Sequence, residues 1–147
     1  MPISLSLLDP NRDVDARALA RLESEQLAWF GSIGRDGFPH AVPVWFLVYD
    51  DRILVLSEPA TAKVRNIRVN DHAMIHLEAG DDGEKLTLLQ GTATISEKPT
   101  LEWIPEIGAA YGAKYERGLA GLTLTVETMA ERYSNVIEFV PSKLIAW

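Results

Sequence analysis

The chain of 147 residues contains no cysteine. Disulfide bonds, thiolate metal sites and cysteine nucleophiles are therefore excluded from its chemistry. Histidine is also scarce, with three residues in all, and two of them, His72 and His76, lie in one segment that has the pattern of a strand. Side chains four residues apart on a strand lie about 13 Å apart, too far to share a metal ion. The sequence thus predicts no metal site.

The chain also lacks a long apolar run and a surplus of positive charge. No uncharged stretch approaches the roughly 20 apolar residues that span a membrane. The N-terminal segment has no basic region followed by an apolar core, so we expect no signal peptide and a cytoplasmic location. Fourteen basic residues against 21 acidic ones give a net charge of −7. This balance argues against general nucleic-acid binding, which needs clustered lysine and arginine side chains.

What the chain does contain is the composition of a globular protein, with 47% hydrophobic residues and no repeat or linker. We therefore expect a single domain over residues 1–147. Short apolar runs separated by turn residues predict strands, and segments of helical periodicity predict helices. The predicted strands are 26–33, 40–48, 52–57, 72–78, 85–96 and 135–140, the last followed by an extended tail over 141–147. The predicted helices are 13–24, 61–70, 99–118 and 125–132.

The connections between the predicted strands are mostly short turns. Asp36-Gly37 supplies the positive φ that a tight hairpin requires, and Asp50-Asp51 marks a second turn. A parallel sheet would need a crossover after each strand, and the first three strands have none. The sequence therefore predicts a mainly β fold with flanking helices (α+β), in which an antiparallel sheet closes into a barrel.

The segment 37–66 concentrates the features of a binding site. Two apolar strands are followed by a loop that ends at Thr61, a favourable residue for capping a helix. Lys63, Arg65 and Arg68 then fall in the first turns of that helix, and residues 59–70 contain no acidic residue. Free N–H groups at a helix start, beside cations, form a physically sensible anion site.

The order of these motifs resembles the flavin-binding split barrels related to pyridoxamine 5′-phosphate oxidase. The resemblance lies in G-x-P-H-x-x-P-V-W-F at residues 37–46, an aliphatic strand ending in Ser57, and T-A-K-V-R-N-I at residues 61–67, and it extends from about Leu27 to Trp147. It implies an antiparallel split β-barrel, a homodimer, and FMN bound between the protomers. It also implies an oxidoreductase that transfers hydride to or from a small organic substrate. No catalytic residue is assigned.

The same resemblance implies a set of cofactor-binding residues. Lys63 matches a lysine that binds the cofactor phosphate, and Thr61 caps the helix, holds the phosphate, or does both. The set consists of Val42, Pro43, Val44, Trp45, Leu56, Ser57, Thr61, Ala62, Lys63, Asn66 and Trp147, the last of which we expect at the dimer interface. His40 faces either the substrate pocket or the solvent. Trp103, Tyr111 and Tyr115 either line a flat aromatic pocket or pack the helices against the barrel, and packing is the favoured role.

The chain departs from the oxidases at the phosphate site. Val42 and Leu47 stand where those enzymes carry an arginine and a lysine, and Ala62 replaces a further arginine. The chain also lacks their C-terminal Arg/His substrate motif, so the oxidase activity itself is not expected. Two alternatives to FMN chemistry stay open. One is a reductase that uses the 5-deazaflavin coenzyme, and the other is a non-catalytic module that binds flavin or haem.

Overall fold

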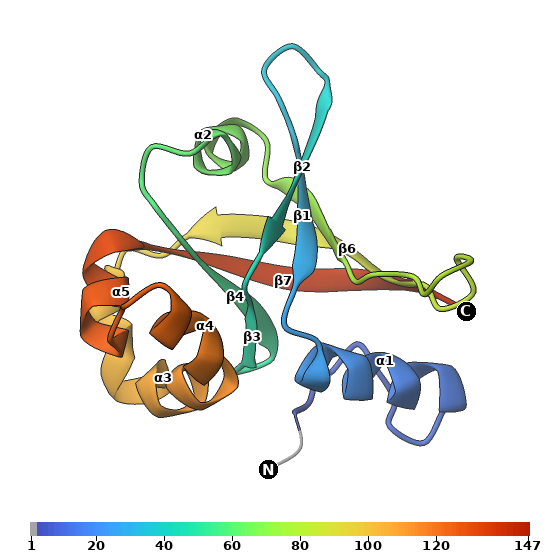
Figure 1. The fold of residues 1–147 in the computed structure, drawn as a ribbon. Coiled ribbons are helices and arrows are strands. Elements are labelled where there is room, and N and C mark those ends of the chain that lie inside the picture. The colour runs from blue at the N-terminus through green and yellow to red at the C-terminus, as the bar shows by residue number, and fades with distance from the viewer. Residues whose placement is uncertain (1–2) are drawn as a thin grey trace.

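The computed structural model describes residues 3–147 as a strongly curled antiparallel sheet with helices around it (Figure 1). The helices are α1 (Asp13–Ser24), α2 (Ala62–Val69), α3 (Thr100–Lys114), α4 (Glu116–Gly121) and α5 (Val126–Arg132). The strands are β1 (Ala28–Ile33), β2 (Pro39–Val44), β3 (Leu47–Tyr49), β4 (Arg52–Ser57), β5 (His72–His76), β6 (Thr87–Ile95) and β7 (Asn135–Ala146). The expected mainly β fold with flanking helices is confirmed.

The strands lie in the order β2-β1-β5-β6-β7-β4-β3, and every neighbouring pair is antiparallel. The two edge strands, β2 and β3, are separated in sequence by Trp45 and Phe46 alone. The chain therefore passes from one edge of the sheet to the other over two residues. This short connection holds the two edges together and makes the sheet a split barrel.

The prediction of one strand over residues 40–48 is therefore wrong. At the crossover the backbone bonds to a side chain instead of a neighbouring strand: the Phe46 N–H donates to the Tyr115 hydroxyl at 2.8 Å. The Phe46 carbonyl lies 3.0 Å from the same hydroxyl and accepts a hydrogen bond from Lys114 Nζ at 2.9 Å. The apolar residues Val44, Trp45 and Phe46 carry no turn signal, so the sequence alone gave no indication of the break.

Two other boundaries differ from the prediction. β7 continues through the segment predicted as a tail, because β6 pairs with it as far as Ala146 across an irregularity between Gln90 and Gly91. A Cβ on Gly91 would lie 2.2 Å from the Val140 carbonyl oxygen, so only glycine fits where the two backbones approach this closely. The predicted helix 99–118 is broken at Tyr115 into α3 and α4.

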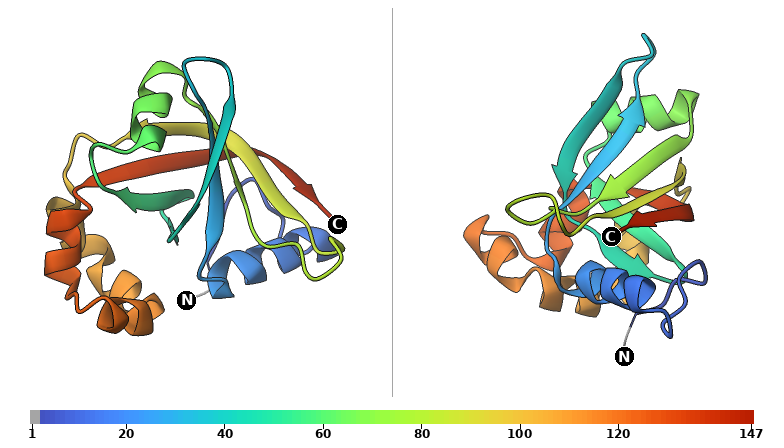
Figure 2. Two further views of the ribbon diagram at one scale, coloured as in Figure 1. Left: turned by 45° about the horizontal axis from the view of Figure 1, so that its top comes forward. Right: turned by 90° about the vertical axis from the view of Figure 1, so that its right-hand side faces the viewer.

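The apolar residues form two cores on opposite faces of part of the sheet. The first fills the barrel and includes Phe30, Phe46, Ile53, Val55, Ile75, Leu89 and Phe139. The second lies between the sheet and helices α3–α5 and includes Leu54, Leu56, Trp103, Ile107, Tyr115 and Met129. Because β4 contributes to both cores, its residues from Ile53 onward are all buried, which accounts for an aliphatic run without polar alternation. Figure 2 shows α3–α5 gathered on one side, with α2 apart from them beside the β1–β2 hairpin.

Candidate functional site

A pocket of about 480 Å³ lies where the ends of β2 and β4, the start of α2 and the helices α3–α5 meet. A volume of this size is within the range of small-molecule sites. We call it the central pocket, and its lining residues are Leu27, Pro43, Val44, Trp45, Leu56, Ser57, Glu58, Thr61, Lys63, Tyr111, Leu122, Met129 and Tyr133. Within residues 3–147, no helix is long and apolar enough to cross a bilayer, and no metal-ligand cluster of three His, Asp or Glu residues occurs.

The first wall of the central pocket is polar and is formed by the end of β4 and the start of α2. Ser57 is buried, and its hydroxyl lies 3.1 Å from that of Thr61. Thr61 occupies the cap position of α2, but its side chain does not accept a hydrogen bond from the helix, which corrects the prediction of a side-chain cap. The first N–H groups of α2 are therefore left without a side-chain partner, as an anion site requires.

Lys63 is the cation of this wall. It is half-buried, and burial lowers the pKa of its ammonium group, while the nearby Glu58 acts in the opposite direction. The Glu58 carboxylate is itself paired with Arg132 Nε at 3.1 Å. Within residues 3–147, Lys63 forms no ion pair. A partly desolvated ammonium that forms no ion pair in the described part of the chain, beside uncapped helix N–H groups, favours binding of an anion.

The second wall is apolar and aromatic, and it is formed by the crossover residue Trp45 with helices α3–α5. The Trp45 and Tyr115 rings are nearly parallel, with centroids 4.4 Å apart, and the Tyr111 and Tyr115 centroids are 5.0 Å apart. A Cβ on Gly118 would come within 2.6 Å of the Trp45 ring, so α4 packs directly against the indole. Burial raises the pKa of Tyr111, so its hydroxyl stays protonated at neutral pH.

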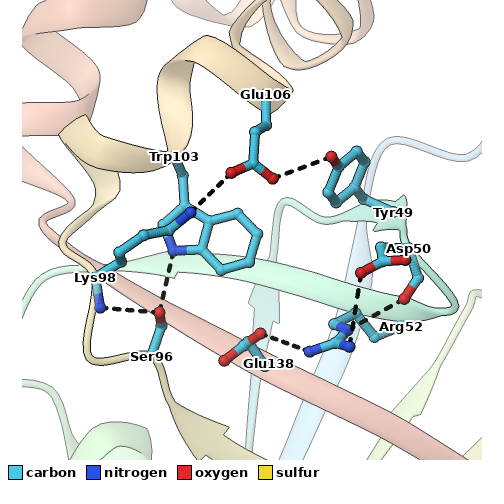
Figure 3. Close-up of polar contacts among 8 residues, drawn as sticks. All are labelled: Tyr49, Asp50, Arg52, Ser96, Lys98, Trp103, Glu106 and Glu138. Atoms are coloured by element: carbon cyan, nitrogen blue, oxygen red, sulfur yellow. Dashed lines mark hydrogen bonds and ion pairs between the residues drawn. The ribbon is translucent and has the colours of Figure 1, made fainter.

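Polar contacts fasten α3 to the sheet and thereby fix the second wall (Figure 3). Glu106 on α3 accepts hydrogen bonds from Lys98 Nζ at 2.8 Å and from the Tyr49 hydroxyl on β3 at 3.1 Å. Trp103 Nε1 donates to Ser96 Oγ at 3.1 Å. Because these contacts hold one face of α3 against β3 and the segment after β6, Tyr111 further along the helix is placed at the pocket.

The structure brings seven of the predicted cofactor-binding residues to the central pocket: Pro43, Val44, Trp45, Leu56, Ser57, Thr61 and Lys63. Four others do not line it. Val42 packs against the barrel core, and Ala62 lines a different cavity. Asn66 is buried and donates a hydrogen bond to Ser32 Oγ at 3.1 Å. Trp147 is 64% exposed and donates to the Gly83 carbonyl at 3.0 Å.

Five lining residues were not indicated by the sequence. Leu27 and Glu58 lie just before β1 and just after β4, and Leu122, Met129 and Tyr133 lie in or directly after α4 and α5. Tyr111 takes both of the roles considered for it, since it packs in the second core and lines the pocket. The apolar face of a helix shows which residues are buried, but it does not show which cavity they border. Nothing in the pattern of α3–α5 therefore distinguished these residues from the rest of the second core.

Comparison with known proteins shows which family and which solved structures the chain resembles. The model of the pyridoxamine 5′-phosphate oxidase family matches residues 14–147. The chain is structurally similar to a conserved hypothetical protein from Mycobacterium tuberculosis, with a TM-score of 0.73 and 22% identity over 99% of this chain and 86% of that one. It is also similar to the haem storage protein HutZ from Vibrio cholerae, with a TM-score of 0.68 and 16% identity over 88% of this chain and 92% of that one.

A third structural neighbour is an F420 reductase, with a TM-score of 0.63 and 21% identity over 86% of this chain and 94% of that one. No curated protein sequence matches the chain. At these identities the neighbours establish the fold, an α+β split barrel, as the resemblance implied. The haem storage protein and the F420 reductase are named for different ligands, so the function of this chain has to be inferred from the residues of its own pocket.

Proposed function

The chain belongs to the pyridoxamine 5′-phosphate oxidase family, and from this membership we propose that its central pocket binds FMN and that the protein is a flavin-dependent oxidoreductase. The observation that carries the proposal is Lys63, a half-buried ammonium at the start of α2 that forms no ion pair with any described residue. A phosphate there would accept hydrogen bonds from the lysine and from free helix N–H groups.

The residues of the two walls suit the two parts of this cofactor. On the polar wall, Lys63 would neutralise the phosphate, and the hydroxyls of Ser57 and Thr61 would bind its oxygens. On the aromatic wall, Trp45 and Tyr111 offer flat apolar surface for a ring system and exclude water from it. Bound FMN would supply hydride-transfer chemistry, while the chain supplies binding, orientation and a dry environment.

The phosphate site has fewer cations than the oxidases carry. Val42 packs against the barrel core and Leu47 is buried in the second core, so neither position holds a charge near the pocket. Lys63 therefore supplies most of the protein's positive charge at the phosphate. We propose that a second copy of the chain completes the site in a homodimer, which sedimentation of the protein with and without FMN would test.

The experiment is a titration of the cofactor-free protein with FMN, followed by the change in flavin absorbance and fluorescence. Lys63→Met keeps the length of the side chain and removes its charge. We expect it to weaken binding about 10- to 100-fold, which corresponds to the roughly 1.5–3 kcal/mol of a charge-assisted hydrogen bond. The matched control is Lys85→Met, at an exposed lysine of the loop before β6. Unchanged affinity in Lys63→Met, or an equal loss in both variants, would contradict the proposal.

A reductase that uses the deazaflavin coenzyme is the second candidate. Two observations favour it: the fold shared with an F420 reductase, and a single lysine where the oxidases place several phosphate cations. The same titration with each cofactor separates the candidates, because binding of the deazaflavin alone would replace FMN in the proposal. Haem is the third ligand to test. Haem binding without either flavin would instead indicate a non-catalytic module, although no histidine lines the central pocket.

A further inference from the structure

A second cavity, of about 670 Å³, lies between α2 and the β1–β2 hairpin, and it shares no lining residue with the central pocket. Figure 1 shows the tip of this hairpin rising beside α2. We call the cavity the arginine hollow, and its lining residues are Gly34, Arg35, Asp36, Phe38, Pro39, His40, Ala62, Arg65, Asn66, Arg68 and Val69. Its chemistry differs from that of the central pocket and is not explained by the proposed cofactor.

The hollow gathers positive charge on a protein whose net charge is −7. Arg65 and Arg68 are three residues apart on α2 and so share one face of the helix, while Arg35 faces them from the hairpin turn. Asp36 is the one acidic residue of the lining. Within residues 3–147, none of the three arginines forms an ion pair. Three cations against one carboxylate in a concavity create a local positive potential that attracts anions.

His40 lies between the hollow and a neighbouring cavity, and it carries an unsatisfied polar atom. It lines the hollow, and its Nδ1 is the one buried side-chain nitrogen or oxygen without a hydrogen-bond partner within residues 3–147. Buried polar atoms in folded proteins nearly always have a partner, and an orphaned one lowers stability. Because protein atoms cover Nδ1, a ligand in the hollow reaches it only if the imidazole ring turns.

The hollow also has an apolar rim. Phe38 is 73% exposed and Val69 is 67% exposed, and both belong to the lining. Exposed side chains of this size, placed beside cations, suit a ligand that combines negative charge with an apolar body. The planar guanidinium groups match the oxygen geometry of a phosphate group, to which arginine binds through paired hydrogen bonds.

We propose that the arginine hollow binds an organic phosphate, with the phosphate held by Arg35, Arg65 and Arg68 and the apolar part against Phe38 and Val69. This site is separate from the central pocket, because α2 lies between them and contributes Lys63 to one and Arg65 and Arg68 to the other. The proposal does not rest on FMN binding, and it holds whichever cofactor the central pocket takes.

The test measures binding of phenyl phosphate by calorimetry in the Lys63→Met protein, so that the lysine of the central pocket cannot bind the probe. We expect Arg65→Ala with Arg68→Ala to weaken this binding at least tenfold. The matched control is Arg17→Ala with Arg117→Ala, which removes two exposed arginines on α1 and α4 that line neither cavity. We expect the control to bind as tightly as its parent. All four side chains are exposed, and thermal unfolding verifies that each variant is folded.

A second comparison tests the apolar rim. Phenyl phosphate should bind several-fold more tightly than inorganic phosphate, and Phe38→Ser should remove that preference while leaving the affinity for inorganic phosphate unchanged. An equal loss in the two arginine pairs would overturn the proposal, since it would show attraction by net charge alone. Weak binding that no variant changes would identify an adventitious ion only. Binding that is present in the original protein and absent in Lys63→Met would assign the phosphate to the central pocket and also overturn the proposal.

Discussion

The two walls of the central pocket differ in how far their polar groups are satisfied. On the first, polar wall, which we call the α2 wall, Lys63 has no ion pair within residues 3–147 and the helix N–H groups have no side-chain cap. On the second, aromatic wall, which we call the helical wall, the Tyr115 hydroxyl lies 2.8 Å from the Gln26 carbonyl oxygen and accepts a hydrogen bond from the Phe46 N–H. The Tyr115 ring stacks on the Trp45 ring. The Trp45–Tyr115 part of the helical wall is thus fixed by its own contacts, whereas the α2 wall leaves Lys63 and the uncapped helix N–H groups available to a ligand.

The helical wall should show the largest loss of stability on mutation. Tyr115→Phe removes the hydroxyl that bonds the backbone of the crossover and leaves the buried Phe46 N–H without a partner. We expect a loss of about 2–3 kcal/mol in the free energy of unfolding, measured by urea denaturation. The control is Tyr133→Phe, because the Tyr133 hydroxyl makes no hydrogen bond in the described part of the chain, and the expected loss is below about 0.5 kcal/mol. Equal losses would remove the distinction between the two tyrosines.

This crossover also marks the limit of what the sequence could predict about the fold. Strand positions, hairpin turns and the antiparallel arrangement follow from local patterns, and the structure agrees with most of them. The break at Trp45 and Phe46 does not, because its cause is a hydrogen bond to a residue 69 positions later in the chain. Local propensity favours one long strand there, and a tertiary contact overrides it.

In the candidate site, too, the sequence pattern predicted some features, and tertiary packing decided others. Thr61 and Lys63 were predicted from a short motif, and both line the central pocket. Ala62 and Asn66 belong to the same motif but face elsewhere, since successive residues of a helix are rotated by about 100°. A motif fixes the neighbours of a residue in sequence, whereas the side of the helix that faces a ligand depends on the packing of α2 against β1 and β6.

The second prediction concerns Lys114, a half-buried cation at the end of α3 beside the helical wall. Its Nζ lies 3.6 Å from the centroid of the Phe46 ring, and burial lowers its pKa to about 8. An unfolded lysine titrates near 10.5, so between pH 8 and 10.5 the unfolded state binds more protons and stability rises with pH. Above about pH 10 stability falls with pH. Burial raises the pKa of Tyr111 and Tyr115 in the folded protein, so the unfolded tyrosines lose their protons at a lower pH than the folded ones.

Lys114→Met should remove most of the rise in stability between pH 8 and 10. At pH 7 it should stabilise the protein by about 1 kcal/mol, a value that allows for solvent screening of a partly exposed group and for the lost hydrogen bond to Phe46. Urea denaturation at pH 7 and pH 9.5 measures both effects, with the exposed Lys85→Met as the control. A rise that is as steep in Lys114→Met as in the original protein would show that another group causes it.

The smallest expected effect on stability is that of Lys63→Met, and it tests most directly whether the α2 wall serves binding and not stability. Burial lowers the pKa of Lys63, so its charged form destabilises the ligand-free protein at neutral pH. Lys63→Met should therefore raise the melting temperature of the ligand-free protein, by less than Lys114→Met does. Excess FMN should reverse the order, since the original protein binds it more tightly and gains more stability from it. If Lys63→Met melts below the original protein without ligand, Lys63 stabilises the fold, and the α2 wall is not the wall reserved for binding.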